Sequence, residues 1–297
     1  MSKWFMIVDV AKCCNCQNCT LATKDEFVGN DYTGYSAAQP LIGHEWLTID
    51  RHIRGSGTMI DVTYVPRMCN HCDNAPCIKA GAGAVYKRSD GIVIIDPVKA
   101  KGKKNIVSSC PYHAIWWNDE LGLPQHWIFD AHLLDQGWKE PRCAQACPTE
   151  ALRALKVSDD EMATLVKEQD LSVIEAGLHS TKPRVYYRNL DRVNRQFIGG
   201  NVVLTSVAGC VDNVEGAVVD LASADRTVIL RSQTDRFGDF KFVGLEGAGK
   251  KYNVKVNYKQ YEEIVLDIAL TESRYLGSID LRQPSAGPMS NRVSTEF

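Results

Sequence analysis

Cysteines at short, regular intervals are the residues of this sequence whose spacing could do chemistry. In the first group, Cys13, Cys16 and Cys19 stand at C-x2-C-x2-C spacing. Three thiolates at this spacing can wrap around one iron–sulfur cube, and a fourth must then come from a distant segment. The group therefore predicts a cluster loop that ties two remote parts of the chain together.

The later cysteines form a second triplet and two groups that end in Cys-Pro: Cys69, Cys72 and Cys77; Cys110; and Cys143 with Cys147. In bacterial ferredoxins a cysteine before proline is the last of a cluster-binding run. The segments after the two Cys-Pro pairs, YHAI and TEAL, resemble each other as repeats. We interpret the chain as nested ferredoxin halves, in which the first group joins the fourth and the second joins the third.

A structural zinc site is the main alternative for these cysteines. Zinc sites commonly combine two C-x2-C pairs into four ligands. Triplets followed by a Cys-Pro fit that arrangement poorly, which favours iron–sulfur clusters. The remaining residues of interest are interpreted as ordinary buried thiols or as packed or surface histidines: Cys14, Cys143 and Cys210; His71, His113, His126 and His132.

Short strands and turns should position the cysteines. We expect strands in residues 1–10, 44–51 and 61–65, and a hairpin in residues 84–95. Ser158 and Glu161 form a capping-box pattern that predicts a helix through about residue 169. Residues 182–195 are basic and aromatic, and we expect them to be a linker strapped over the protein surface.

The residue pattern of the sequence changes at about residue 197. Seven short alternating runs follow, separated by Gly, Asp or Asn. This pattern is typical of a small antiparallel sandwich. We therefore predict an α+β chain with a ferredoxin-like cluster domain and linker in residues 1–196, an all-β sandwich of transthyretin or immunoglobulin type in residues 197–281, and a C-terminal tail in residues 282–297.

Composition limits the cellular compartments and the classes of partner that we expect for this chain. The formal net charge is −2, which gives no electrostatic reason to expect nucleic acid or an anionic membrane as partner. No long apolar run and no secretory signal are visible, so a cytoplasmic, reducing compartment is expected, and disulfides are not. No nucleophile motif, phosphate-binding loop or acid pair appears. We expect no catalytic residue on this chain, and a partner that supplies the active site.

Several segments resemble a known family: IVDVAKC, CNHCDNAPC, GAVYKRSDGIVIIDPVKAKGKK, CPYHAIWWNDE, DAHLLD, PRCAQAC and TKPRVYYRNL. They are similar to the iron–sulfur small (beta) subunits of molybdopterin enzymes in the dimethyl-sulfoxide reductase family. Within it, the pyrogallol–phloroglucinol transhydroxylase type is nearest, and the resorcinol hydroxylase type is the runner-up. The resemblance covers nearly the whole chain.

The resemblance implies two complete [4Fe–4S] ligand sets: Cys13, Cys16, Cys19 and Cys147; and Cys69, Cys72, Cys77 and Cys110. A third family cluster would use the positions of Thr23, Trp127, Asp130 and Cys143. One thiolate and one carboxylate hold such a cube poorly, so we infer that this cluster is lost and that Trp127 fills its volume. A fourth family cluster is absent too, because Gly81, Lys103 and Ile106 replace its cysteines.

The resemblance also implies a heterodimer with a large catalytic subunit that binds molybdopterin guanine dinucleotide with Mo or W. The reaction would be hydroxyl transfer between phenolic rings, which needs no net electron flow and could tolerate a gap in an electron-transfer chain. An electron-exporting subunit of the resorcinol hydroxylase type remains the alternative. A stand-alone electron carrier and a structural subunit, whose clusters merely staple the fold, also stay open.

Overall fold

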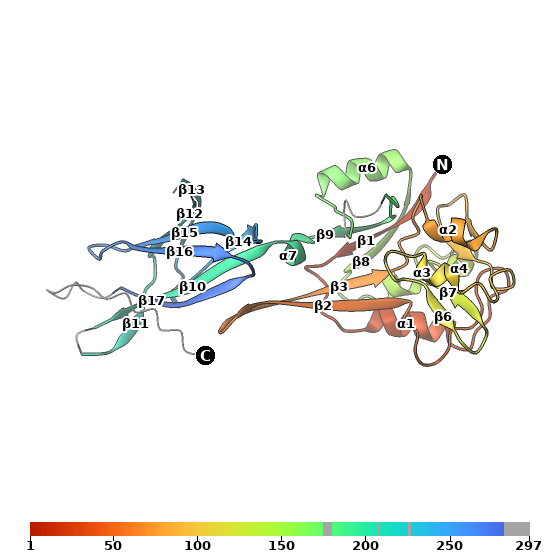
Figure 1. Cartoon of the computed structure of the whole chain (residues 1–297), viewed down its shortest axis with the longest axis horizontal. Helices are drawn as coiled ribbons and strands as arrows, with labels where there is room; N and C mark the ends of the chain where they lie inside the picture. The colour runs from red at the N-terminus through yellow and green to blue at the C-terminus, as the bar shows by residue number, and fades with distance from the viewer. Residues whose placement is uncertain (175–179, 207, 225–226, 282–297) are drawn as a thin grey trace. The chain divides into compact units, whose positions relative to one another are not determined.

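The computed structural model describes residues 1–174, 180–206, 208–224 and 227–281 (Figure 1). The chain divides into two compact units. The first contains residues 1–51 and 63–190, and the second contains residues 52–62 and those from Asp191 onward. No helix of the described ranges is long and apolar enough to cross a membrane.

The first unit is built on a three-stranded sheet with strand order β8-β1-β9. The central strand β1 (Lys3–Asp9) runs antiparallel to β8 (Leu152–Val157) and parallel to β9 (Val185–Arg188). Helix α6 (Asp159–Glu168) packs Met162 against Phe5 and Ile7 of β1. The predicted capping box is confirmed, since Ser158 and Glu161 bond reciprocally at the start of α6.

Short elements of the first unit carry the cysteine segments. They comprise five helices and three two-stranded sheets: α1 (Asn18–Phe27), α2 (Pro76–Gly81), α3 (Asn105–Ser108), α4 (Ala131–Asp135) and α5 (Arg142–Gln145); β2 (Leu47–Ser56) with β3 (Met59–Met68), β4 (Val85–Lys87) with β5 (Val93–Ile95), and β6 (Trp116–Asn118) with β7 (Leu123–Gln125). The strands expected at the N-terminus and in the hairpin of residues 84–95 are confirmed.

The interpretation of residues 182–195 as a surface strap was wrong. This segment contains β9, which pairs with β1, and it buries Arg184 and Tyr187 almost completely. Arg184 can be buried because its guanidinium donates to Asp73 and Asp159. The Tyr187 hydroxyl donates to the carbonyl of Pro66 at 2.9 Å. Satisfied polar ends let long amphipathic side chains enter a core.

The second unit holds the short helix α7 (Asp191–Asn194) and two four-stranded sheets. One sheet has the order β11-β10-β14 with β17 also paired to β10, and the other has the order β13-β12-β15-β16. Their bounds are β10 (Gln196–Thr205), β11 (Val211–Asn213), β12 (Val218–Ser223), β13 (Val228–Gln233), β14 (Asp239–Leu245), β15 (Lys250–Asn257), β16 (Ile264–Leu270) and β17 (Arg274–Asp280). The tail expected in residues 282–297 lies outside the described residues.

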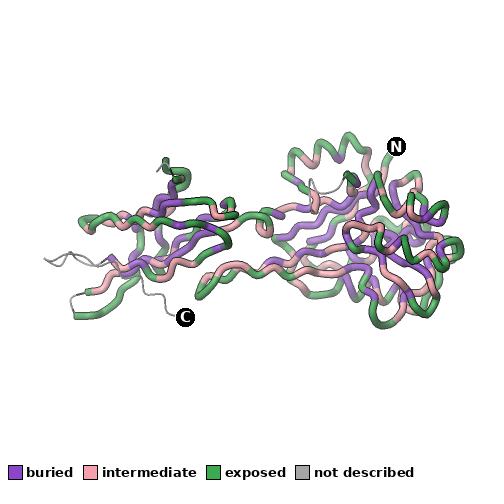
Figure 2. Tube along the Cα trace, in the orientation of Figure 1, coloured by how far each residue is buried: buried purple, intermediate pink, exposed green. Residues whose placement is uncertain are grey.

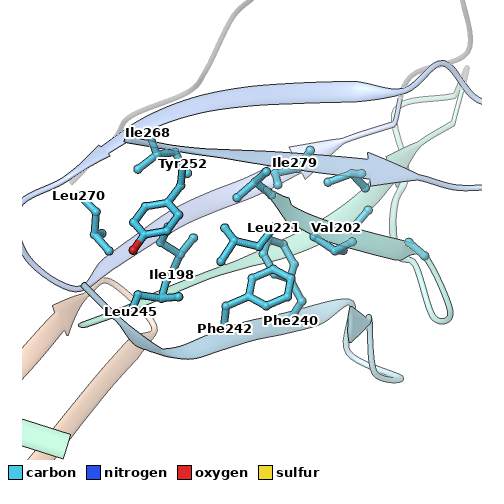
Figure 3. Packing of buried hydrophobic residues seen from close by; sticks show 14 of the residues in the cluster. Ile198, Val202, Leu221, Phe240, Phe242, Leu245, Tyr252, Ile268, Leu270 and Ile279 are labelled. Atoms are coloured by element: carbon cyan, nitrogen blue, oxygen red, sulfur yellow. The ribbon is translucent and has the colours of Figure 1, made fainter. Parts of the chain in front are cut away.

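A single hydrophobic cluster joins both sheets of the second unit. Figure 3 shows Ile198, Leu221 and Phe242 directed toward one another from β10, β12 and β14. Along much of β14 and β16, more buried residues alternate with exposed ones, which is how a sheet with one covered face is patterned (Figure 2). The predicted alternating runs therefore form strands here.

The tip of the β2–β3 hairpin, residues 52–62, belongs to the second unit. Asp61 accepts hydrogen bonds from Arg54 and Arg192, and the Arg54 guanidinium lies over the Phe197 ring. Gly55 adopts a φ of +89°, and a Cβ there would collide with Phe197 Cζ and the Met59 carbonyl. Glycine is therefore required where this turn meets β10.

Candidate metal centres

The first cysteine group lies in the loop between β1 and α1. Asn15 and Gln17 both have φ near +60°, at 59° and 63°, which lets the loop curl tightly between Cys13 and Cys19. Asn is among the residues that adopt this conformation most readily. Cys19 is buried in the first turn of α1, whereas Cys14 and Cys16 are exposed. Cys210, in the second unit, is exposed too, so the interpretation of Cys14 and Cys210 as buried thiols was wrong.

Strand pairing brings Cys147 to this loop. Val8 of β1 lies opposite Leu152 of β8, and the Asp9 amide donates to the Ala151 carbonyl at 2.7 Å. The end of β1 and the start of β8 are therefore held side by side, with one cysteine segment attached to each. Burial, and to a smaller extent the neighbouring Cys147 thiolate, raises the pKa of Cys13. The two remote segments meet as the nested-halves interpretation predicts.

The second group surrounds a cavity in the first unit. Cys69 and Cys72 follow β3, Cys77 lies in α2, and Cys110 follows α3. All four line one cavity, together with Val93, Tyr112 and His126. In the described part of the chain, no three His, Cys, Asp or Glu side chains converge closely enough to hold a single metal ion.

The two cysteine sets repeat each other in backbone conformation. The residue two positions after the first cysteine has a positive φ in both triplets, at Asn15 and at His71. The third residue after each Cys-Pro cysteine, His113 or Glu150, has a φ of 53° and donates its amide to the cysteine carbonyl at 3.2 Å. Such turns aim successive backbone N–H groups at a common centre, which suits an anionic ligand.

Backbone donors reach the sulfurs of both Cys-Pro cysteines. The Ala151 amide donates to Cys147 Sγ at 3.3 Å. Burial raises the pKa of Cys147, but hydrogen bonds from Leu152, Thr149 and Ala151 outweigh it, so the pKa lies below its usual value. The Ala114 amide makes the corresponding bond to Cys110, where burial prevails and the pKa is raised. These backbone N–H groups are positioned to donate hydrogen bonds to thiolates.

Burial makes the other thiolates costly without a positive partner. It raises the pKa of Cys19 and Cys72 to about 11 and that of Cys77 to about 12, and repulsion between Cys77 and its neighbours adds to the effect. Iron ions compensate such charges, because a thiol that coordinates a metal is deprotonated outright. Eight thiols in two sets, most of them buried or half-buried and with backbone N–H donors at both Cys-Pro cysteines, therefore fit the donor chemistry of two iron–sulfur clusters.

Thr23, Trp127, Asp130 and Cys143, at the position expected for a third family cluster, form a packed polar site. Trp127, Asp130 and Cys143 are completely buried, and Thr23 nearly so. The Trp127 indole N–H donates to Asp130 Oδ1 at 3.0 Å, and the Thr23 hydroxyl donates to the Cys19 carbonyl at 2.9 Å. Burial, then Asp130 and then Cys19, raises the pKa of Cys143 well above its usual range. This agrees with the interpretation of Cys143 as a buried thiol.

The position of a fourth family cluster is closed by packing. A Cβ at Gly81 would lie 2.5 Å from Val85 Cγ2, so no cysteine fits there without a shift. Lys103 Nζ donates to the Gly81 carbonyl at 2.8 Å, and Ile106 is completely buried against Val85. The segment has become part of the apolar core between α2, α3 and the β4–β5 hairpin.

One feature near the cysteines was not recognised in the sequence. Lys87 Nζ donates to the carbonyls of His71 and Cys72 at 2.8 and 2.9 Å, and thus clamps the second cysteine loop. A half-buried lysine that bonds to backbone carbonyls is rarely expected from sequence, and the VYK strand gave no signal. His71, His126 and His132 are buried as packed histidines, whereas His113 is exposed.

Comparisons with known proteins agree with this geometry. The family described as "4Fe-4S dicluster domain" matches residues 60–157. That range holds six cysteines, fewer than the eight thiolates of two clusters, and it omits Cys13, Cys16 and Cys19.

Relatives extend the similarity to most of the chain. The pyrogallol hydroxytransferase small subunit of Pelobacter acidigallici is 40% identical over 90% of this chain and 95% of its own length. A tetrathionate reductase subunit of Salmonella typhimurium is 30% identical over 64% of this chain and 73% of its own. The thiosulfate reductase electron transfer subunit PhsB of Salmonella typhi is 29% identical over 57% and 84%.

Proposed function

This chain belongs to the family of iron–sulfur subunits that includes the pyrogallol hydroxytransferase small subunit, and we propose that it holds two [4Fe–4S] clusters in a complex with a larger catalytic subunit. One cluster is bound by Cys13, Cys16, Cys19 and Cys147, and the other by Cys69, Cys72, Cys77 and Cys110. The single observation that carries this proposal is the repeated backbone geometry of the two cysteine sets.

The clusters supply sites for one-electron oxidation and reduction, and the chain supplies their binding and insulation. Thiolates hold the irons, backbone amides such as that of Ala151 donate to the sulfurs, and buried apolar residues such as Val93 exclude water. Hydrogen bonds to sulfur and burial are the means by which a protein sets cluster potential. None of these residues makes or breaks a substrate bond, which fits a non-catalytic subunit.

We infer that the partner carries molybdopterin guanine dinucleotide with Mo or W and transfers hydroxyl groups between phenolic rings. The relative with 40% identity, named a pyrogallol hydroxytransferase subunit, supports this reaction class. The packed site of Trp127 and Asp130 supports it independently. A missing cluster lengthens the electron path, and a transfer with no net electron flow can tolerate that.

The proposal also includes the domain boundaries and the compartment of the chain. We propose that residues 197–281 form an all-β sandwich domain, extended by the hairpin tip of residues 52–62. The cluster domain proposed for residues 1–196 then excludes this hairpin tip, and its residues 182–195 are not a simple linker because they contain β9. All eleven cysteines lie in the described residues and are free of disulfides, which supports a reducing, cytoplasmic compartment.

The test is an anaerobic assay of the co-purified complex with a trihydroxybenzene, with and without an artificial electron acceptor. Fe, Mo and W are counted in the same preparation. Product formed without acceptor supports the hydroxyl-transfer reaction. Product that requires the acceptor, with the acceptor reduced in step, contradicts it and favours the electron-exporting alternative of the resorcinol hydroxylase type.

A further inference from the structure

The carboxylate of Asp130 lies where the lost cluster would have had a ligand, and it bonds to two segments at once. Asp130 Oδ1 accepts from the Trp127 indole at 3.0 Å, and Oδ2 accepts from the Arg142 amide at 2.7 Å. Asp130 is completely buried. Phe129 and Asp130 both have positive φ, at 57° and 50°, so the backbone is bent to aim this side chain inward.

The bond to Arg142 acts on the helix that leads to Cys147. Arg142 is the first residue of α5, whose preceding residue, Pro141, offers no side-chain cap. Within the helix, the Ala146 amide donates to the Arg142 carbonyl at 2.8 Å, and the Cys147 amide donates to Ala144 at 3.1 Å. Fixing the start of this single turn therefore fixes the position of Cys147 at its end.

Through Trp127, Asp130 is also linked to the second cysteine set. The Trp127 ring, which orients the carboxylate, stacks on Phe129 with ring centroids 4.8 Å apart. It also meets the His71 ring edge-on at 5.6 Å. His71 lies between Cys69 and Cys72, and its Nδ1 accepts from the Val93 amide at 3.1 Å. The same pair of side chains is thus packed between both cysteine sets.

An ion-pair network centred on Glu26 also holds α5. Glu26 of α1 accepts from Arg142 Nη1 at 2.7 Å and from His132 Nε2 at 2.8 Å. This network fixes the Arg142 side chain, whereas Asp130 fixes its backbone. Burial raises the pKa of Asp130 to about 6, although the bonds from Arg142 and Trp127 oppose the shift. The carboxylate lies in a completely buried site despite this cost, and its two hydrogen bonds compensate part of it.

We propose that Asp130 is a positioning residue for the N-terminal cluster: its carboxylate replaces the lost third cluster as the link that holds α5, and hence Cys147, in place. This inference rests on the proposed ligand set of Cys13, Cys16, Cys19 and Cys147. It assigns to a hydrogen-bonded carboxylate the stapling role that thiolates and iron would have had.

The experiment compares Asp130→Asn with Thr23→Val in the anaerobically reconstituted full chain. Asn can accept on only one side, whereas Thr23 is a buried residue of the same vacated site whose hydroxyl bonds only within its own helix. We expect iron release from the N-terminal cluster to a chelator to be about tenfold faster in Asp130→Asn, as for loss of an outer-shell partner. Hydrogen exchange of residues 142–147 should rise as well, and Thr23→Val should change neither.

Trp127→Phe is a second test variant for the case in which Asp130→Asn does not fold. It removes the indole donor and keeps the charge of Asp130. It should accelerate iron release in the same direction by a smaller factor, and it should shift the midpoint potential of the N-terminal cluster relative to Thr23→Val. Equal iron release and exchange in all three variants and the wild type would overturn the inference. A wild-type chain that binds no iron would instead reject the proposed ligand sets, while the exchange comparison of residues 142–147 would still decide the role of Asp130.

Discussion

At the scale of single residues, two cysteines four positions apart have different roles. Cys147 lies with Cys13 and Cys19 and receives the Ala151 amide, whereas Cys143 faces Asp130 in the packed site. Cys147→Ala should therefore lose the iron of the N-terminal cluster, and the count should fall from about eight toward about four per chain. Cys143→Ala should leave the count unchanged. Colorimetric iron analysis of both variants checks this, and equal loss in both would contradict the assignment.

Glu26 offers a second residue-scale prediction, because its carboxylate is almost buried. Burial alone would raise its pKa, but hydrogen bonds from Tyr32, His132 and Arg142 hold the pKa below its usual value. A lowered pKa contributes stability that is present above the unfolded-state value, about 4.3, and is lost as pH falls through the folded-state value. Glu26→Gln should therefore lower the free energy of unfolding by about 2 to 3 kcal/mol near pH 7.

The difference between Glu26→Gln and the wild type should shrink below about pH 4. Asp25→Asn is the matched control, since Asp25 contacts the same Arg142 at 2.8 Å but is largely exposed. It should cost less than about 1 kcal/mol. Urea unfolding of the chain from about pH 2.5 to 8 measures all three proteins. A Glu26→Gln effect that is independent of pH would show that its charge is not what stabilises the network.

At the scale of elements, the turn of the β2–β3 hairpin depends on glycine. Gly55→Ala places a Cβ against Phe197 and the Met59 carbonyl at a φ of +89°. Gly216→Ala has a similar φ of +77° but open space around it. Strain from φ alone costs about 1 kcal/mol, and the collision should add to it. Thermal unfolding followed by circular dichroism should show a clearly larger loss for Gly55→Ala, and equal losses would mean that the tip does not pack as described.

Elements were predictable from sequence where a local pattern decides them. The capping box of Ser158 and Glu161 and the alternating runs after residue 197 both reflect local chemistry. The segment around Arg184 was misjudged because charge suggested exposure, and its partners Asp73 and Asp159 are remote in sequence. The assignment of the hairpin tip to the second unit also depends on remote contacts, such as that of Arg54 with Phe197.

At the scale of the whole molecule, cysteine spacing and resemblance predicted which segments should meet, and strand pairing brings them together. Spacing could not reveal the role of Asp130. A carboxylate at a former ligand position gives no signal of its own until the Trp127 and Arg142 donors are seen around it. The same holds for Lys87, whose ammonium clamps the second loop through backbone carbonyls. Hydrogen bonds to backbone groups cannot be recognised from sequence, because every residue carries such groups.

The central claim is that this chain holds two clusters and not three. Iron and acid-labile sulfide, counted per chain after anaerobic reconstitution, test it most directly. Two complete ligand sets predict about eight of each per chain. A count near twelve of each would show that the site of Thr23, Trp127, Asp130 and Cys143 holds a third cluster, and would contradict the two-cluster assignment.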